Sequence, residues 1–279
     1  MSQVLEEKIV SAIRFNLDLA EKNWAEKGHF LLESAETMRA GTASFDSMPS
    51  NIPNHPRVPA GRVVEDKFIA LVADMRDSSK HMLNAISEKK TKRRIPGVER
   101  IYYETSALLP SLDETIAYHG GRVTEYLGDG VLALFHYEDK ETIYSARHAA
   151  EDIIGCMRNY INEEIKIRYG FPEIHLGVGL AISNCFVTLV GSHGNLQPKV
   201  FGHSVYRASK LSKGWDKTCV DDYLYRIWPK SKDGVLRFNL MKGNDFKGYV
   251  INKKRGFKFK VQHPVLGYWR LLKKLHRVS

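Results

Sequence analysis

The apolar and polar positions of the chain repeat with helical periods in some stretches and extended periods in others. Apolar residues recur every three or four positions over residues 98–118 and 140–168, which predicts two long helices. Residues 3–40 also have a helical pattern, and a shorter helix is predicted from Ser78 to Ile86. Strands are predicted from short apolar or alternating runs at 68–73, 122–127, 131–135, 174–182, 186–190 and 249–251. This alternation predicts an α/β sandwich with helices packed on a mixed sheet.

Breaks in the pattern divide the chain. Residues 41–63 are predicted to be a loop, because Pro53, Pro56 and Pro59 lie there among Ser, Asn and Gly. Pro110 is expected to bend the helix that contains it. The predicted organisation is an N-terminal helical segment with a Pro-rich loop over residues 1–63, a central domain over residues 64–252 and a basic tail over residues 253–279.

Two aspartates lie at the ends of predicted strands. Asp74 follows the apolar run 68–73, and Asp129 lies in a Gly-Asp-Gly turn between two runs that read as a β-hairpin. Taken alone, each has an ordinary structural explanation, as a turn residue or as the cap of a helix. Together, two carboxylates at strand ends of one sheet can hold a pair of divalent cations, a recurrent arrangement for displacement at phosphorus.

Composition agrees with a soluble enzyme, and we expect it to be cytoplasmic. The 279 residues, 43% of them hydrophobic, suffice for one large domain with a core. No apolar run approaches the roughly 20 residues that span a bilayer, and Glu6 and Glu7 stand where a signal peptide would be basic. Cys156, Cys185 and Cys219 lack metal-binding or redox spacing, which fits a reducing compartment. We therefore expect no membrane segment.

The net charge of +10 is unevenly distributed. Between Lys253 and Arg277 the chain has nine Lys or Arg and no Asp or Glu, and residues 89–94 form a second basic cluster. Such stretches either attract a polyanion such as nucleic acid or form a solvated tail and loop. Because neither contains a nucleic-acid-binding motif, we expect no direct nucleic-acid binding. A nucleic-acid-binding protein that uses the tail is the alternative.

Three blocks within residues 67–251 resemble the catalytic domain of the adenylate/guanylate cyclase (class III) nucleotidyl cyclases. They run from Phe68 to Ser79, from His119 to Phe135 and from Pro198 to Leu211, with a weaker match at residues 240–243. The resemblance implies the nucleotide cyclase (ferredoxin-like) fold, a mixed and mainly antiparallel sheet with flanking helices, in a catalytic domain over residues 64–252.

The resemblance also implies a metal site. In such a cyclase Asp74 and Asp129 are the catalytic carboxylates that bind two divalent cations, Mn²⁺ or Mg²⁺, and Met75 is assigned to the same site. Hard oxygen ligands of this kind suit both metals. The reaction is attack of a nucleotide's 3′-hydroxyl on its own α-phosphorus, with loss of pyrophosphate.

The turn after the first aspartate is assigned to the substrate. Backbone N–H groups of this turn and the following helix are expected to face the β- and γ-phosphates. The candidate substrate-binding residues are therefore Met75, Arg76, Ser78 and Ser79. Asp77 stands where the family usually has glycine, and we expect it to cap the helix.

The third block departs from the family at two positions. The family's substrate-orienting Asn is Tyr206 here, and its transition-state Arg is Lys210. Lys210 remains a candidate catalytic residue, because lysine keeps the charge but loses the bidentate fork. Tyr206 either fills a dimer interface, occupies space that a purine would need, or stacks on a base.

Glu125 and Lys199 stand at the positions that read the base in adenylate cyclases. Guanylate cyclases also place Glu at the first position. An acceptor beside a donor equally fits uracil or cytosine, so hydrogen bonding alone does not decide. An ion pair between Glu125 and Lys199 without a ligand role is the structural alternative. Because Tyr206 narrows the pocket, we favour a pyrimidine.

The compact layout resembles the pyrimidine cyclases of bacterial antiphage (Pycsar) signalling. The resemblance implies a uridylate cyclase, with cytidylate cyclase next, that makes cyclic UMP from the pyrimidine nucleoside triphosphate for a separate cyclic-nucleotide effector. It also implies a homodimer with composite sites, in which one protomer supplies the metal aspartates and its partner supplies Lys199, Tyr206 and Lys210. A guanylate cyclase and an inactive nucleotide-binding pseudo-cyclase are the alternatives.

Overall fold

The computed structural model describes residues 3–33, 47–60, 63–87, 94–192, 195–231, 234–241 and 246–253. The helical elements are α1 (Gln3–Glu33), α2 (Ser78–Leu83), α3 (Gly97–Tyr118), α4 (Lys140–Asp152), a π-helical segment (Ile153–Met157), α5 (Arg158–Tyr169), α6 (His203–Leu211) and α7 (Asp222–Ile227). The strands are β1 (Ser47–Ile52), β2 (His55–Pro59), β3 (Val64–Met75), β4 (Ile86–Ser87), β5 (Arg94–Ile95), β6 (Arg122–Tyr126), β7 (Gly130–His136), β8 (Leu176–Ser192), β9 (Asn195–Gly202), β10 (Lys217–Asp221), β11 (Leu236–Leu240) and β12 (Gly248–Lys253).

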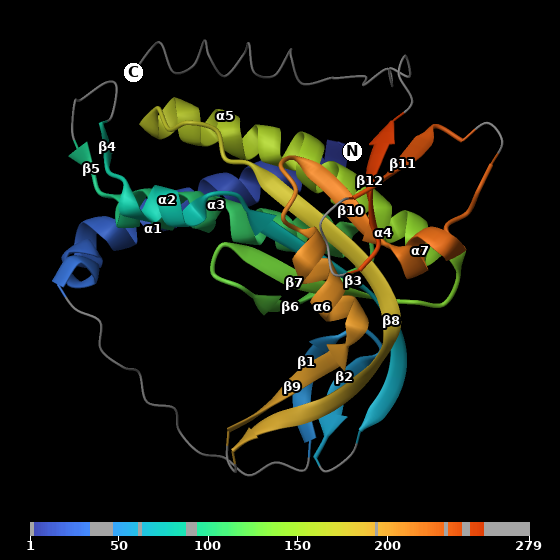
Figure 1. The fold of residues 1–279 in the computed structure, drawn as a ribbon. Helices are drawn as coiled ribbons and strands as arrows, with labels where there is room; N and C mark the ends of the chain where they lie inside the picture. The colour runs from blue at the N-terminus through green and yellow to red at the C-terminus, as the bar shows by residue number, and fades with distance from the viewer. Residues whose placement is uncertain are drawn as a thin grey trace.

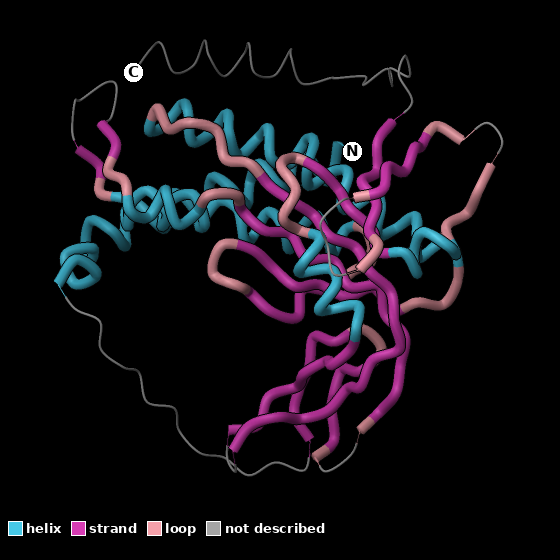
Figure 2. The backbone as a smooth tube through the Cα atoms, viewed as in Figure 1, coloured by secondary structure: helices cyan, strands magenta, loops and turns pink. Residues whose placement is uncertain are grey.

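Eight of the described strands form one central sheet. Its order is β11-β12-β10-β8-β3-β7-β6, and β9 also pairs with β8. Every pairing is antiparallel except that of β10 with β8. Helices flank this sheet (Figures 1 and 2). The predicted mixed, mainly antiparallel sheet with flanking helices is confirmed.

Strand β3 lies inside the sheet and is buried on both faces. Successive side chains of a strand point to opposite faces, and those of β3 alternate between two cores, with Ile69, Leu71 and Ala73 in the larger and Phe68, Ala70 and Val72 in the smaller. Helices α1, α3 and α5 lie together over the larger core (Figure 1). The smaller core includes Ala208 of α6. Because β3 is fixed from both sides, the position of its last residues is also fixed.

The predicted N-terminal helix is confirmed as α1. It buries Leu5, Ile9, Ile13 and Leu17, and it packs on α3. These residues recur every four positions, which places them on one helical face. Residues 34–40 of the prediction lie outside the described residues.

Two predicted helices differ in detail. The helix expected over 140–168 contains the π-helical segment around Gly155, where the winding changes, although Ile143, Ile153 and Ile161 remain buried as the pattern requires. The helix that begins at Ser78 ends at Leu83 rather than Ile86. Its C-cap residue is extended, and β4 and β5 then pair with each other.

The predicted division at residues 183–185 is wrong. The two strands expected at 174–182 and 186–190 form one strand, β8, because the polar residues Ser183 and Asn184 stay paired with β3. The same strand turns back into β9, which the sequence pattern did not indicate.

The loop predicted for residues 41–63 is also wrong where the structure describes it. Residues 47–59 form the β1–β2 hairpin, whose turn contains Asn54 with a φ of 64°. Proline is tolerated because this sheet has only two strands, so many backbone N–H groups need no partner strand. The side chains of Ile52 and Val58 are buried in the smaller core and so pack the hairpin against the central sheet.

Asp66, near the start of β3, ties this hairpin to the central sheet. Its two carboxylate oxygens lie 2.8 Å from Nε2 of His55 on β2 and 3.0 Å from Nε2 of His136 on β7. Burial alone would raise the pKa of Asp66. Hydrogen bonds from the Lys67 N–H and His55, with the charge of His136, outweigh it and hold the pKa below its ordinary value.

Replacing Asp66 with alanine is expected to destabilise the protein at neutral pH by about 1–3 kcal/mol, because hydrogen bonds to a charged group are lost. A carboxyl with a lowered folded-state pKa stabilises above its unfolded pKa, so the difference from wild type should shrink as the pH falls below about 4. Urea unfolding at pH 7 and at pH 3.5 measures it. Glu138→Ala removes an exposed partner of His136 and should cost less than about 0.5 kcal/mol. A pH-independent difference would contradict the assignment.

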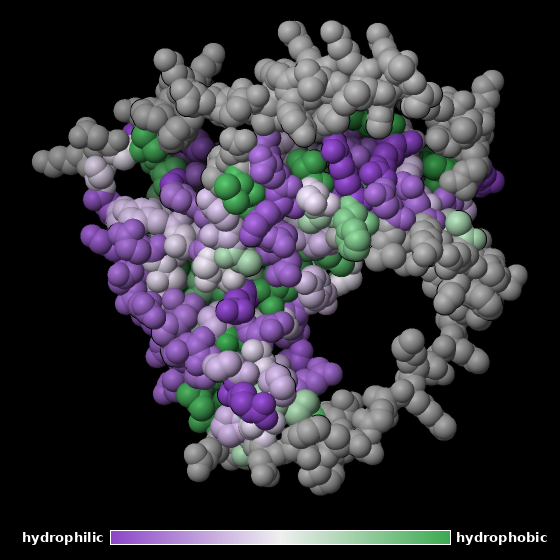
Figure 3. Space-filling model, turned by 180° about the vertical axis from the view of Figure 1, so that it is seen from behind, coloured by the Kyte–Doolittle hydropathy of each residue, from purple (hydrophilic) through white to green (hydrophobic). Residues whose placement is uncertain are grey.

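No described helix is both long enough and sufficiently apolar to cross a membrane. Seen from behind, the described surface is mostly hydrophilic, and its hydrophobic residues form small separate patches (Figure 3).

Candidate active site

The hairpin of β6 and β7 forms as predicted and places Asp129 against the end of β3. Gly128 in its turn has a φ of 85°, a left-handed conformation that glycine adopts without strain. The Met75 N–H donates to the carbonyl oxygen of Asp129 at 3.1 Å, and Asp74 lies opposite Gly130 in the strand pairing. The two aspartates are therefore neighbours at one end of the sheet.

Gly130 permits this close approach. A Cβ atom at this position would lie 2.2 Å from the carbonyl oxygen of Ala73 and 3.0 Å from the Cα of Asp74. Both are backbone atoms of β3 that cannot move aside cheaply. Any larger residue at position 130 would push the hairpin, and Asp129 with it, away from Asp74.

The carboxyl group of Asp74 lies in an unfavourable setting for a negative charge. Burial above all, with the neighbouring Asp129 carboxylate, raises the pKa of Asp74 to about 6 in spite of the opposing effect of the Arg76 guanidinium. Two neighbouring carboxylates attract a cation, because their negative charges repel each other. Their hard oxygen atoms suit Mg²⁺ or Mn²⁺.

Arg76 supplies a positive charge of the chain's own at this point. Its guanidinium forms an ion pair with Asp74, while its Nε is buried without a hydrogen-bond partner. Its backbone N–H donates to the carbonyl oxygen of His175 at 2.8 Å, so the main chain stays anchored if the side chain moves. The guanidinium of Arg76 thus neutralises part of the negative charge of the two carboxylates. A metal ion could take over this role, so the arrangement fits a metal site. The buried side chain of Met75 leaves only its backbone to contribute.

The two aspartates do not form a complete metal site. In the described part of the chain, no group of three or more His, Cys, Asp or Glu side chains is arranged to hold a metal ion. Mg²⁺ is commonly bound by one or two carboxylates together with substrate phosphates and water. The remaining ligands would therefore come from outside the protein.

Arg76→Gln is expected to tighten Mn²⁺ binding in the absence of nucleotide by about three- to tenfold, because it removes a unit charge that competes for Asp74. Titration calorimetry or the electron paramagnetic resonance of free Mn²⁺ measures this. Lys80→Gln is the matched control, since Lys80 is exposed and pairs with Asp77. Unchanged or weaker binding in Arg76→Gln would show that the guanidinium does not compete with the metal.

Ser78 and Ser79, two of the candidate phosphate-binding residues, lie just after Arg76 in the chain. Ser78 is half-buried and Ser79 exposed at the start of α2. Asp77 occupies the N-cap position, as expected, but its side chain makes no capping hydrogen bond. It accepts instead from Nζ of Lys80 at 2.6 Å. The physical reason is its left-handed backbone, with a φ of 59°, whereas an N-cap residue that accepts from the helix is usually extended.

Glu125 and Lys199 form a second group. Lys199 Nζ lies 2.9 Å from Oε2 of Glu125, so the ion pair foreseen as the structural alternative is present. About one third of each side chain remains exposed. The pair thus presents an acceptor beside a donor, the combination that the edge of a base requires.

Tyr206 and Lys210 form a third group on α6. They lie one helical turn apart, with Nζ of Lys210 5.4 Å from the centre of the Tyr206 ring, and half of Tyr206 is exposed. Arg207 does not supply the missing guanidinium on this face. It lies 3.3 Å from the buried Asp221 and stacks over Tyr223.

The structure brings the candidate residues together within these three groups. Among the described residues, no hydrogen bond or ion pair joins Tyr206 or Lys210 to Asp74 or Asp129.

Two buried polar residues that contact His81 and Ile174 were not predicted. Glu104 is fully buried on α3, and Asn162 is 6% exposed on α5. The sequence does carry a sign that Glu104 is buried, because this acid lies on the same helical face as the apolar residues Ile101 and Leu108. Asn162 interrupts an apolar stripe less visibly, because it lies beside Ile161.

Comparison with solved structures finds nucleotide cyclases. The guanylyl cyclase Cya2 aligns with a TM-score of 0.55 and 16% identity over 71% of this chain and 96% of that one. The adenylyl cyclase CyaB from P. aeruginosa gives 0.53 and 15% over 71% and 100%. A bacterial light-regulated adenylyl cyclase gives 0.54 and 15% over 76% and 57%. No family model and no curated protein sequence matches. The chain therefore has the fold of nucleotide cyclase catalytic domains.

Proposed function

We propose that this protein is a metal-dependent nucleotide cyclase. The observation that carries the proposal is the adjacency of Asp74 and Asp129 at the ends of β3 and β7, within a cyclase fold. The elevated pKa of Asp74 and the guanidinium drawn to it support a site that receives positive charge. The same carboxylates have no other cation partner among the described residues than Arg76.

Each group of residues has a part in the proposed reaction. Divalent cations bound at the aspartates would acidify the 3′-hydroxyl and offset charge on the α-phosphate and the pyrophosphate. Asp74 and Asp129 hold these cations, and Arg76, released from Asp74, is positioned to meet the triphosphate. Lys210 offers a positive charge toward the transition state, and its contact with Tyr206 restricts where that charge lies.

We propose a pyrimidine nucleoside triphosphate as the substrate, with UTP ahead of CTP. Glu125 can accept from the ring N–H of uracil or the amine of cytosine, and Lys199 can donate to the adjacent acceptor. Tyr206 takes more space than asparagine, which a smaller base tolerates. On the resemblance to antiphage pyrimidine cyclases, the cyclic product is proposed as a second messenger for a separate effector in antiphage defence.

The direct test is incubation of the purified protein with Mn²⁺ and ATP, GTP, CTP or UTP separately, followed by mass analysis. A cyclic 3′,5′-monophosphate and pyrophosphate in equal amounts are expected. No cyclic product from any of the four nucleotides would refute the enzyme proposal. A product from GTP alone would support the guanylate cyclase alternative.

Turnover of UTP or CTP is expected to exceed that of ATP by at least about tenfold, because the adenine-reading pair is replaced. Glu125→Gln should change the ratio of nucleotide turnover while leaving thermal unfolding unchanged, since Glu125 is part of a partly exposed ion pair. Glu114→Gln, an exposed acid on α3, is the matched control. Equal turnover of ATP and UTP would mean that these residues do not read the base.

A catalytically inactive nucleotide-binding protein is the second candidate. The observation that favours it is the pair of changes on α6, where the Tyr206 ring holds a lysine in place of an arginine. Such a protein would bind a nucleoside triphosphate with Mn²⁺ in calorimetry and release no pyrophosphate.

A further inference from the structure

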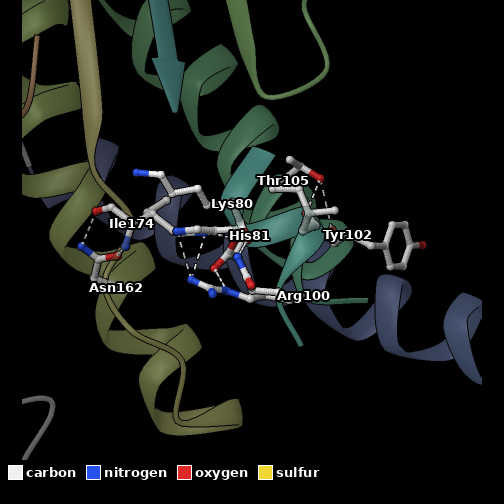
Figure 4. Close-up of polar contacts among 10 residues, drawn as sticks. Lys80, His81, Arg100, Tyr102, Thr105, Asn162 and Ile174 are labelled. Atoms are coloured by element: carbon white, nitrogen blue, oxygen red, sulfur yellow. Dashed lines mark hydrogen bonds and ion pairs between the residues drawn. The ribbon is translucent and has the colours of Figure 1, made fainter. Parts of the chain in front are cut away.

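The segment after Asp74 is held by buried polar side chains that the proposed chemistry does not use. None of the six residues of α2 is buried, so apolar packing does not fix this helix on α3. Its polar tie is His81, whose Nδ1 lies 2.8 Å from Oε2 of Glu104. The other carboxylate oxygen of Glu104 accepts from Nε of Arg100 at 2.8 Å. Figure 4 shows His81 of α2 meeting Arg100 of α3.

The side chains around His81 are polar and complementary to it. Glu104 as a carboxylate only accepts hydrogen bonds, and Arg100 only donates them. Nη2 of Arg100 lies 2.9 Å from Nδ1 and 3.1 Å from Nε2 of His81. The imidazole thus lies between an acceptor on Glu104 and a donor on Arg100. The tie is therefore directional, and an apolar side chain of similar size cannot replace it.

The backbone contact between α2 and α3 is equally tight. A Cβ atom at Gly97, the first residue of α3, would lie 2.0 Å from the carbonyl oxygen of Met82. The two helices thus meet backbone to backbone beside the His81 tie. Small displacements of α2 on α3 are resisted by both contacts.

A second buried anchor acts from α5. The Asn162 side chain donates from Nδ2 to the carbonyl oxygen of Ile174 at 3.1 Å and accepts at Oδ1 from the Ile174 N–H at 2.8 Å (Figure 4). The next carbonyl oxygen, that of His175, accepts from the Arg76 N–H at 2.8 Å. Asn162 therefore holds residues 174–175, which come just before β8. His175 in turn holds the backbone of Arg76.

We propose that Glu104 and Asn162 are positioning residues of the candidate active site. Glu104 acts through His81 and Asn162 through residues 174–175, and together they clamp residues 75–81 from two helices. The clamp keeps Asp74, Arg76 and the two serines of α2 in place beside Asp129. The inference rests on the proposed function, which assigns metal and triphosphate to this segment.

The first test compares His81→Leu with His81→Gln. Leucine leaves the Glu104–Arg100 pair intact but removes the hydrogen bond between residue 81 and Glu104. KM for the preferred nucleotide should then rise about tenfold, and kcat should fall less than about threefold. This is the pattern expected when binding groups are misplaced. Glutamine can donate and accept, so it should restore KM to within about twofold of wild type. Hydrogen exchange of the amides of residues 76–83 should accelerate in His81→Leu only. Leu83→Ala, an exposed position on the same helix, should change neither measurement.

The second test is Asn162→Asp, which keeps the volume and the acceptor for the Ile174 N–H but sets an oxygen against the Ile174 carbonyl. It should accelerate exchange at the Arg76 amide and weaken Mn²⁺ binding, measured by calorimetry without nucleotide, by about three- to tenfold. Unchanged KM and Mn²⁺ affinity in His81→Leu and Asn162→Asp, despite faster exchange, would overturn the positioning role alone. Wild-type protein that binds Mn²⁺ but none of the four nucleotides would instead refute the proposed function and the inference with it.

Discussion

Alanine in place of Asp74 or Asp129 is expected to abolish cyclisation without unfolding the protein. Metal ions contribute several kcal/mol of charge stabilisation in displacement at phosphorus, which corresponds to a loss of roughly a thousandfold or more. Neither aspartate contributes to the hydrophobic cores. Removing Asp129 also removes a charge that raises the pKa of Asp74, so its metal-free stability should equal or exceed that of wild type. Mass analysis of cyclic products, Mn²⁺ calorimetry and thermal unfolding measure these effects.

Asp77→Asn provides the matched control. Asp77 is a third carboxylate of the same segment, but it is exposed and forms an ion pair with Lys80. Its backbone is in the left-handed conformation, which asparagine tolerates. Mn²⁺ affinity and turnover should therefore stay within about twofold of wild type, as for most surface substitutions. A folded Asp74→Ala or Asp129→Ala variant with near-normal turnover would disprove the two-metal assignment.

Mixing Asp74→Ala with Lys210→Ala is expected to restore about a quarter of wild-type activity under two-fold symmetry. The proposed composite site takes its aspartates from one protomer and Lys210 from its partner. In a mixed dimer both lesions then fall in one site and leave the other intact. Random exchange makes about half the dimers mixed, each with one working site of two.

The structural motivation is that α6 and the two aspartates form separate groups within one chain. Subunit exchange must be demonstrated first, for example by energy transfer between labelled protomers. Each variant alone must be inactive. If both conditions hold and no activity returns, each site is built within a single chain.

Local patterns predicted the elements whose determinants are close in sequence. The β6–β7 hairpin followed from alternation around a glycine-rich turn, and α1 and α3 followed from their apolar faces. The continuous strand β8 was not predicted, because Ser183 and Asn184 look like a break unless their pairing with β3 is known. The β1–β2 hairpin was missed for a similar reason, since its prolines are acceptable on edge strands, and both strands of this two-stranded sheet are edges.

The same distinction holds for the candidate site. Asp74 and Asp129 could be named from the sequence because each lies at the end of a strand whose apolar pattern is visible in the neighbouring residues. The ion pair between Glu125 and Lys199 could be foreseen only as one of two alternatives. Glu104 and Asn162 were missed because what they hold, His81 and Ile174, is far away in the sequence and is brought near only by folding.

Gly130 sets a condition for anyone who wishes to transplant this pair of aspartates into a designed scaffold. Because the hairpin touches the backbone of Ala73 at a distance that no side chain permits, the two carboxylates cannot be grafted as two independent substitutions. A designer would have to carry over the end of β3, the turn with its glycine, and the main-chain acceptor at His175 as one module. The smallest portable form of this site is a piece of backbone rather than a set of side chains.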